Sequence, residues 1–208
     1  MKLANLNENK TARVSTLCAL YFAQGFPWGF MTIALVAYLA KYGLTVGETG
    51  HLISMAILPW TFKIFWAPII DSINFPQMGK RRPWIIFAQI MMALTLIVLA
   101  MSGDISTNLN YLGWMFFLHN CFASLQDVCT DALAVDILRP EERGKVNGFM
   151  WGSKIIGVGF GGSVMGTILV KTSLNTAVIF QTVLILGVML FPLLFRERSG
   201  EKLLPWSI

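Results

Sequence analysis

Several polar and ionisable side chains interrupt an otherwise apolar stretch, residues 111–136. Asn120, Asp127 and Asp131 recur at i, i+7 and i+11, which places them on one face of a helix, and Gln126 lies beside that face. An ionised aspartate at the centre of a bilayer costs roughly 2.5–3.5 kcal/mol. The pattern therefore favours a wet cavity inside a helix bundle. The alternative is that these aspartates only hold neighbouring helices together.

The chain that positions these residues has the composition of an integral membrane protein. Of its 208 residues, 55% are hydrophobic and 13% are charged, about half the charged fraction of a soluble domain. We expect an all-α membrane protein with a six-transmembrane-helix bundle over residues 14–195, preceded by a tail over 1–13 and followed by the start of a linker over 196–208. The six predicted spans, each long enough to cross a bilayer, are residues 14–41, 46–70, 83–101, 111–136, 145–170 and 176–195.

Basic residues are distributed unevenly between the two sides of this bundle. Of the 16 lysines and arginines, twelve lie in the two tails and in the loops after the second and fourth spans, three in each. The opposite loops contain only Lys41 and Lys171. Because loops rich in lysine and arginine stay in the cytoplasm, we expect both termini to be cytoplasmic.

Charged and polar residues from four spans share one depth in the predicted bundle. Counted from the cytoplasmic ends of their spans at 1.5 Å per residue, Asp127 and Lys154 lie about 13 Å deep, near the midplane of a ~30 Å core. Lys63 lies at about 12 Å and Gln24 at about 16 Å, while Asp131 is shallower, at roughly 8 Å. Buried charges generally require pairing, so we expect Lys154 to contact Asp127, with Lys63 or Asp131 as a neighbour. The predicted cavity residues are Gln24, Lys63, Asn120, Gln126, Asp127, Asp131 and Lys154.

A carboxylate in such a cavity could carry a proton. Burial disfavours its charged form and a neighbouring lysine favours it, so the two effects oppose each other. A change in the access of water to the cavity could then shift the balance. We therefore predict proton coupling, with Asp131 or Asp127 as the carrier, and uptake that responds to a proton gradient.

Other kinds of site are not indicated. Cys18, Cys121 and Cys129 lie in apolar segments without C-x-x-C spacing, as small buried residues do rather than metal ligands or disulfides. Residues 157–162 match G-x-G-x-x-G, but no predicted strand precedes them and they lie inside a span, which argues against dinucleotide binding. We predict no enzyme, no catalytic residues, no metal, no cofactor and no nucleic-acid partner. The expected partners are a small-molecule solute, the proton and the lipid bilayer.

Several short motifs resemble the AmpG-type permeases of the major facilitator superfamily. They are Tyr21–Pro27, Leu58–Trp60 with Lys63, Trp66–Pro68 with Asp71, Gly79–Trp84, Gln126-Asp127, Asp131-Ala132, Pro140–Gly144 and Glu201–Trp206. The resemblance implies the N-terminal half of a major facilitator superfamily fold. It also implies proton-driven import of anhydro-muropeptides, the fragments of cell-wall recycling, across the inner membrane. Related members carry acetyl-CoA or other solutes.

The resemblance also implies a cytoplasmic gate and a missing partner. The gate would be a charged cluster made by Asp71, Arg81, Arg82, Asp136, Glu142 and Arg143. The superfamily signature between the second and third spans resembles G-x-x-x-D-[RK]-x-G-[RK]-[RK], but Ala67 replaces its first glycine and Ser72 its first basic residue. Family members have twelve spans, so we expect a second six-helix half, supplied by a missing C-terminal half, a partner chain or self-association. The competing hypothesis is a non-transporting membrane fragment with an assembly or regulatory role.

Overall fold

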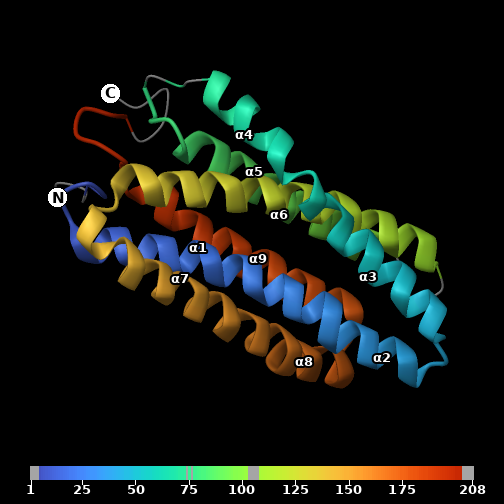
Figure 1. The fold of residues 1–208 in the computed structure, drawn as a ribbon. Helices are drawn as coiled ribbons and strands as arrows, with labels where there is room; N and C mark the ends of the chain where they lie inside the picture. Colours follow the sequence, from blue (N-terminus) through green and yellow to red (C-terminus); the bar gives the residue numbers. More distant parts are fainter. Residues whose placement is uncertain (1–4, 74, 76, 103–107, 203–208) are drawn as a thin grey trace.

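A computed structural model describes residues 5–73, 75, 77–102 and 108–202. The predicted tail and linker therefore lie partly outside the described residues, as do the last four residues of the Glu201–Trp206 motif. Within the described ranges the fold is helical, and the β structure there consists of two isolated bridges. Figure 1 shows the long helices running side by side, with both chain ends at the same end of the bundle.

Six helical segments, some of them interrupted, follow one another along the described residues. The first consists of α1 (Lys10–Gly29), the π-helical turn η1 (Phe30–Ala34) and α2 (Leu35–Lys41), and the second of α3 (Val46–Thr61) and α4 (Lys63–Ser72). The third is α5 (Arg82–Met101) and the fourth α6 (Leu109–Ile137). The fifth consists of α7 (Pro140–Phe160), the π-helical turn η3 (Gly161–Met165) and α8 (Gly166–Lys171), and the sixth is α9 (Leu174–Leu194). The predicted fold class is confirmed.

The first and fifth segments begin four and five residues before the predicted starts at residues 14 and 145. The residues at the two helix starts explain the difference. The side chain of Asn9 accepts a hydrogen bond from the N–H of Ala12, and Pro140 occupies the first position of α7, where its missing N–H does no harm. A capped helix continues beyond its apolar stretch because the cap satisfies the free N–H groups of its first turn.

The first and fifth segments pack closely because glycines bring their backbones together. A Cβ atom on Gly25 would lie 2.2 Å from the carbonyl oxygen of Lys154, and one on Gly161 would lie 2.0 Å from that of Phe26. Gly157 and Gly161 make this contact, as their small-xxx-small spacing allows. By contrast, Gly148 and Gly152, which have the same spacing, face open space. The π-helical turns η1 and η3 also lie against each other.

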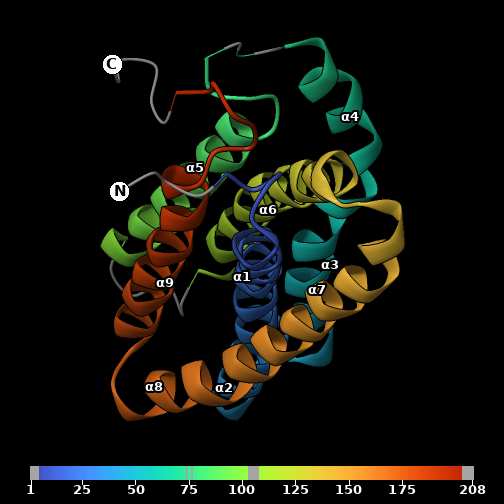
Figure 2. The same cartoon turned by 90° about the vertical axis from the view of Figure 1, so that its left-hand side faces the viewer.

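The other helices arrange themselves around α1 and α6. In Figure 2, α5 and α9 lie on one side of these two helices and α3, α4 and α7 on the other. The segment α3–α4 packs on α6, whereas α7 packs on α1. Both segments are mostly exposed in the isolated chain, while α1 is mostly buried. We refer to the side formed by α3, α4 and α7, with α1 and α6 behind them, as the open face.

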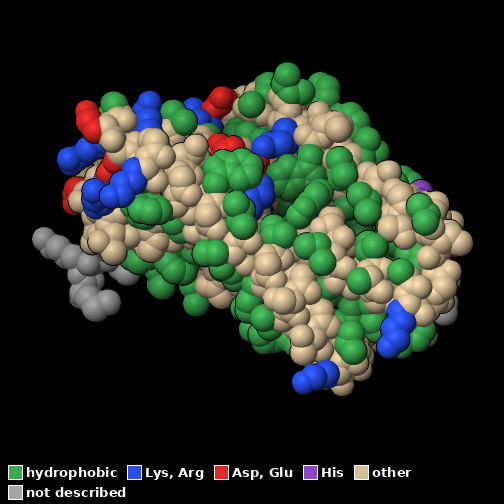
Figure 3. All heavy atoms as spheres, turned by 60° about the horizontal axis from the view of Figure 1, so that its bottom comes forward, with side chains coloured by type: hydrophobic (Ala, Val, Ile, Leu, Met, Phe, Trp, Pro, Cys, Tyr) green, Lys and Arg blue, Asp and Glu red, His purple; other side chains and the backbone are tan. Residues whose placement is uncertain are grey.

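Five of the six described segments are long and apolar enough to cross a membrane. The exception is α6, whose polar stripe keeps it outside that group although it has 29 residues. Most of that stripe is buried among the other helices, so α6 does not need an apolar surface all round. In Figure 3, charged side chains gather at the end where the chain termini lie, and hydrophobic ones cover much of the remaining surface in view.

Candidate functional site

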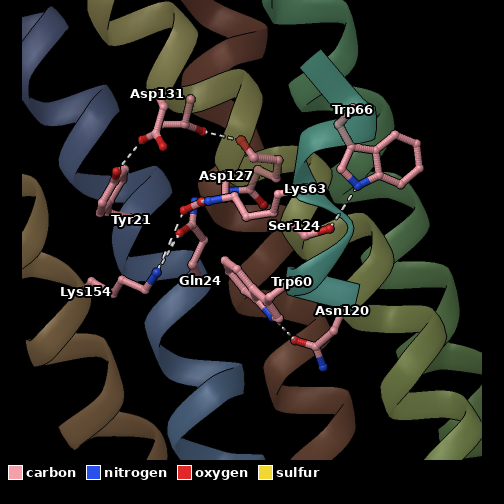
Figure 4. A network of polar contacts seen from close by, with 12 residues as sticks. Tyr21, Gln24, Trp60, Lys63, Trp66, Asn120, Ser124, Asp127, Asp131 and Lys154 are labelled. Carbon is pink, nitrogen blue, oxygen red and sulfur yellow. Dashed lines mark hydrogen bonds and ion pairs between the residues drawn. The ribbon is translucent and has the colours of Figure 1, made fainter. Parts of the chain in front are cut away.

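The carboxylate of Asp127 is the centre of a charged network on the open face. The side chain of Lys63 makes an ion pair and a hydrogen bond with its Oδ2 atom, and the Nζ atom of Lys154 lies 3.8 Å from its Oδ1 atom. The Asp127 side chain is only 5% exposed, compared with 34% for Lys63 and 18% for Lys154. Figure 4 shows how both lysines reach this carboxylate from separate helices. One buried anion is thus shared by two cations.

A break in the second segment places Lys63 in this network. The residue Phe62 leaves the helical conformation, with φ −93° and ψ 7°, and Lys63 is the first residue of α4. The depth count predicted a Lys154–Asp127 contact with Lys63 as a possible neighbour. The structure contains that contact, but Lys63 is the closer partner. The depth of a residue along a helix can be counted from its residue number. The break before Lys63 cannot be predicted from such a count.

Aromatic rings surround the ammonium group of Lys154. Its Nζ atom lies 5.0 Å from the ring centre of Trp60, 5.2 Å from that of Trp151 and 5.7 Å from that of Tyr21, all within the range of cation–π attraction. It also donates a hydrogen bond of 3.4 Å to Oε1 of Gln24. We refer to Lys154 with these three rings as the aromatic cage.

These rings were not predicted from the sequence, although their spacing gave a signal. Each ring precedes a polar network residue by three positions: Tyr21 before Gln24, Trp60 before Lys63, and Trp151 before Lys154. Residues three apart lie on the same side of a helix. On three spans, an aromatic residue stands three positions before an intramembrane polar residue. This repeated spacing could have indicated that the rings lie beside the charged network.

The carboxylate of Asp131 forms a second part of the network, one turn of α6 closer to the chain termini. It accepts a short hydrogen bond from the hydroxyl group of Tyr21. Both residues line a cavity of about 460 Å³ between α6 and α7, together with Arg143, Asn147 and Trp151. Asp131 is exposed, whereas Asp127 is buried. The two aspartates thus share one helix face and differ in their access to solvent.

The two amides predicted for the cavity lie in different places. Asn120 accepts a hydrogen bond of 3.2 Å from the indole N–H of Trp60, which connects it to the aromatic cage. Gln126 is fully buried and donates to the carbonyl of Leu20 on α1. It therefore joins α6 to α1 instead of facing the charged network.

Three of the predicted gate residues meet at the end of the bundle near the chain termini. The guanidinium group of Arg81 donates a hydrogen bond of 2.8 Å to Asp71 and one of 3.1 Å to Asp136. The ammonium group of Lys80 lies 3.0 Å from Asp71 as well. The cluster joins α4, the start of α5 and the end of α6.

The other three predicted gate residues do not join this cluster. Arg82 turns the opposite way and donates to the carbonyls of Pro192 and Met78. Glu142 pairs with Arg13 at 2.6 Å, and Arg143 donates to the carbonyls of Leu138 and Val135. Consecutive residues at the start of a helix point in different directions, so Arg81 and Arg82 cannot share one partner set.

A buried carboxylate from beyond the sixth segment supports the same end of α5. Glu197 is 2% exposed, and it accepts hydrogen bonds from the backbone N–H groups of Lys80, Arg81 and Arg82. Burial raises the pKa of the Glu197 carboxyl, and the backbone donors offset only part of that rise. The residue before Glu197 is held against the N-terminal tail, because the N–H of Leu6 donates a hydrogen bond to the carbonyl of Arg196. Sequence reasoning did not find Glu197, since its partners lie more than 100 residues away.

A bundle of six helical segments, with a buried carboxylate paired to two lysines on one open face, resembles half of a secondary transporter. The sequence profile of the Major Facilitator Superfamily matches residues 17–205. The chain belongs to this superfamily and is a multi-pass membrane protein.

The chain is also similar to individual proteins. The chain is 32% identical over 136 residues, 64% of its length, to the anhydromuropeptide permease of Escherichia coli, and the match covers 26% of that protein. It is 26% identical over 143 residues to an uncharacterised protein of Schizosaccharomyces pombe, with 66% of this chain and 27% of that protein covered. An uncharacterised membrane protein of Saccharomyces cerevisiae is 29% identical over 164 residues, with 67% and 29% covered. The chain thus matches between a quarter and a third of the length of these relatives.

Proposed function

We propose that this chain is half of a proton-coupled permease that takes up anhydro-muropeptides derived from the cell wall. The observation that carries the proposal is the buried Asp127 carboxylate, which two lysines from separate helices share on the open face. Intramembrane ionisable groups are costly and mark transport pathways. The similarity to the anhydromuropeptide permease of Escherichia coli supports this choice of solute. Acetyl-CoA or another small solute is the alternative.

In this proposal, a second six-helix bundle covers the open face and completes the cavity. Secondary transporters bind solute near the midplane between two such bundles, which rock against each other. Both termini lie on the cytoplasmic side of the inner membrane, as the basic loops favour. The cluster of Arg81 with Asp71 and Asp136 then lies at the cytoplasmic end, where it stabilises one state of the gate.

In this proposal the proton carrier is Asp131 or Asp127. The carboxylate of Asp131 lines the cavity between α6 and α7, so water can reach it. Its Tyr21 partner connects it to α1. Asp127 is held between two lysines and is more buried.

A vesicle experiment tests the proposal. The 208-residue chain is reconstituted into vesicles, and the uptake of radiolabelled 1,6-anhydro-N-acetylmuramyl tripeptide is followed with and without an imposed proton gradient. If a second copy of the chain supplies the other bundle, we expect accumulation that a protonophore abolishes. Uptake that ignores the gradient would contradict proton coupling. The absence of any uptake by the chain alone would exclude self-association as the source of the second bundle, which leaves a separate second half or the alternative, a membrane fragment with an assembly or regulatory role.

Replacing Tyr21 with phenylalanine is expected to lower gradient-driven uptake about tenfold. The substitution removes the hydroxyl group that donates to Asp131, and a hydrogen bond to a charged group contributes roughly 1.5–3 kcal/mol. Tyr111→Phe is the matched control, because that hydroxyl contacts Ser102 outside the network. The role of Tyr21 would be wrong if both variants transported equally well.

A further inference from the structure

We propose that Lys154 is the docking site for a carboxylate of the transported solute, and that protonation of Asp127 makes this lysine available. The inference rests on the proposed transport function and identifies the chemical group that the site recognises. Uptake of a proton by Asp127 forms an O–H bond on its carboxylate and removes one negative charge. The carboxylate of the solute then takes its place beside Lys154.

Charge balance is the first argument. In their usual ionised forms, Lys63 and Lys154 carry two positive charges, and Asp127 and Asp131 carry two negative charges that balance them. When Asp127 is neutral, one positive charge in the network has no counter-ion. An isolated buried charge is unfavourable, so the protonated site attracts an anion. One proton and one carboxylate therefore enter together, and the net charge of the site is unchanged.

The unequal positions of the two lysines are the second argument. Lys63 makes the direct ion pair with Asp127, whereas the Nζ atom of Lys154 remains 3.8 Å from it. That distance is longer than the 2.7–2.9 Å of a normal hydrogen bond between an ammonium group and a carboxylate. Within the described residues, Lys154 therefore has this ionic contact and a 3.4 Å hydrogen bond to Gln24, but no charge-assisted hydrogen bond of normal length to a carboxylate. It is the cation that can exchange its counter-ion more easily.

The aromatic cage is the third argument. The rings of Tyr21, Trp60 and Trp151 hold the ammonium group of Lys154 in position. Ring faces attract a cation without removing its charge, so the ammonium group stays able to bind an anion. A cation held in place in this way loses little conformational freedom when a ligand arrives.

The side chains that face Asp127 come from four helices. Lys63 approaches from α4 and Lys154 from α7. Asp131 is the acidic neighbour on α6 itself. Tyr21 on α1 contacts Asp131. Gln24 on α1 is uncharged and donates or accepts hydrogen bonds only. Proton uptake at Asp127 thus alters the charge opposite both lysines at once.

The solute can also reach the site. Figure 4 shows Lys154 reaching the network from α7, across from Lys63 on α4. Trp151 is 52% exposed in the isolated chain, and the Lys154 side chain keeps 18% of its surface accessible. The cage therefore opens toward the side where a solute would lie between two bundles.

A binding experiment without any gradient tests the docking role. The chain in lipid nanodiscs is titrated by calorimetry with 1,6-anhydro-N-acetylmuramic acid and with the corresponding primary amide, which lacks the negative charge. We expect the acid to bind at least about tenfold more tightly than the amide, since it alone makes a charge-assisted hydrogen bond. Titrations in two buffers of different ionisation enthalpy should show uptake of about one proton for each molecule of acid bound, as charge balance requires.

Variants of the network separate docking from a structural role. Lys154→Gln should weaken binding of the acid about tenfold and leave the amide unchanged, whereas Lys154→Arg should retain most of the binding. Lys171→Gln, at the far end of the same helical segment, is the matched control. Asp127→Asn should still bind the acid but without proton uptake, because its side chain is already neutral.

Equal binding of acid and amide, or no weakening in Lys154→Gln, would overturn the proposal. Failure of the wild-type chain to bind the acid would overturn it as well. The test is independent of transport. If gradient-driven uptake were absent while binding depended on Lys154, proton-driven transport would be rejected and docking kept. If driven uptake persisted unchanged in Lys154→Gln, docking alone would be rejected.

Discussion

Replacing Gly161 with alanine is expected to lower the free energy of unfolding by about 3 kcal/mol or more. Overpacking in a well-packed core costs roughly 1–3 kcal/mol, and the added methyl group here would lie 2.0 Å from the carbonyl oxygen of Phe26. That oxygen belongs to the backbone of α1, so no side chain can rotate away. The helices α1 and α7 must move apart, which also displaces Lys154 from Gln24. Thermal unfolding of the purified protein in detergent measures the loss.

The same helical segment supplies the control for this prediction. A Cβ atom on Gly159 would meet nothing within 4 Å, so Gly159→Ala should change stability by no more than about 1 kcal/mol, the difference in helix propensity. Gly29→Ala should behave like Gly161→Ala, since its Cβ atom would lie 2.1 Å from the carbonyl oxygen of Val158. Equal stability of Gly161→Ala and Gly159→Ala would show that these backbones are not in close contact.

Replacing Glu197 with alanine should cost about 3 kcal/mol of stability. Its carboxylate accepts hydrogen bonds from three consecutive N–H groups at the start of α5, and a buried donor without an acceptor costs roughly 1–3 kcal/mol. Alanine would leave these N–H groups without that acceptor. Thermal unfolding again measures the change, and hydrogen exchange at the N–H groups of residues 80–82 should become faster.

Glutamine at position 197 distinguishes the hydrogen bonds from the charge. Burial raises the pKa of the Glu197 carboxyl, so the fold already disfavours the ionised form relative to a solvated glutamate. Glu197→Gln keeps one acceptor oxygen, and we expect it to cost no more than about 1.5 kcal/mol. Glu8→Ala, at an exposed position, is the control for loss of a carboxylate as such. A large loss in Glu197→Gln would mean that the charge matters more than the acceptor.

The six helical segments were predicted from the sequence, and so was the contact between charged residues of separate segments. The positions of apolar stretches and the number of residues between two side chains depend only on the order of residues, so both can be obtained from the sequence. The depth count brought Lys63, Asp127 and Lys154 to one layer, where the structure has them. The same count could not supply rotation about each helix axis, so it did not find that Gln126 turns toward Leu20, away from the network.

Contacts between distant segments were the main omission. The gate residues were grouped because they lie at one end of the bundle, but proximity to that end does not decide which groups face each other. Arg81 joins Asp71 and Asp136, whereas its neighbour Arg82 binds backbone carbonyls on the other side. The role of Glu197 depends on the path of the chain after α9, which no local pattern encodes.

The hydrogen bonds made by the segment after α9 determine where a mechanical load on it would go. Arg196 holds the N-terminal tail through its carbonyl, and Glu197 holds the start of α5. Tension applied to this segment would therefore reach α1 and α5 directly, without first unwinding α9. If an adjoining domain pulls on this segment during a transport cycle, the six-helix bundle should move as a rigid body, and its internal ion pairs should remain formed.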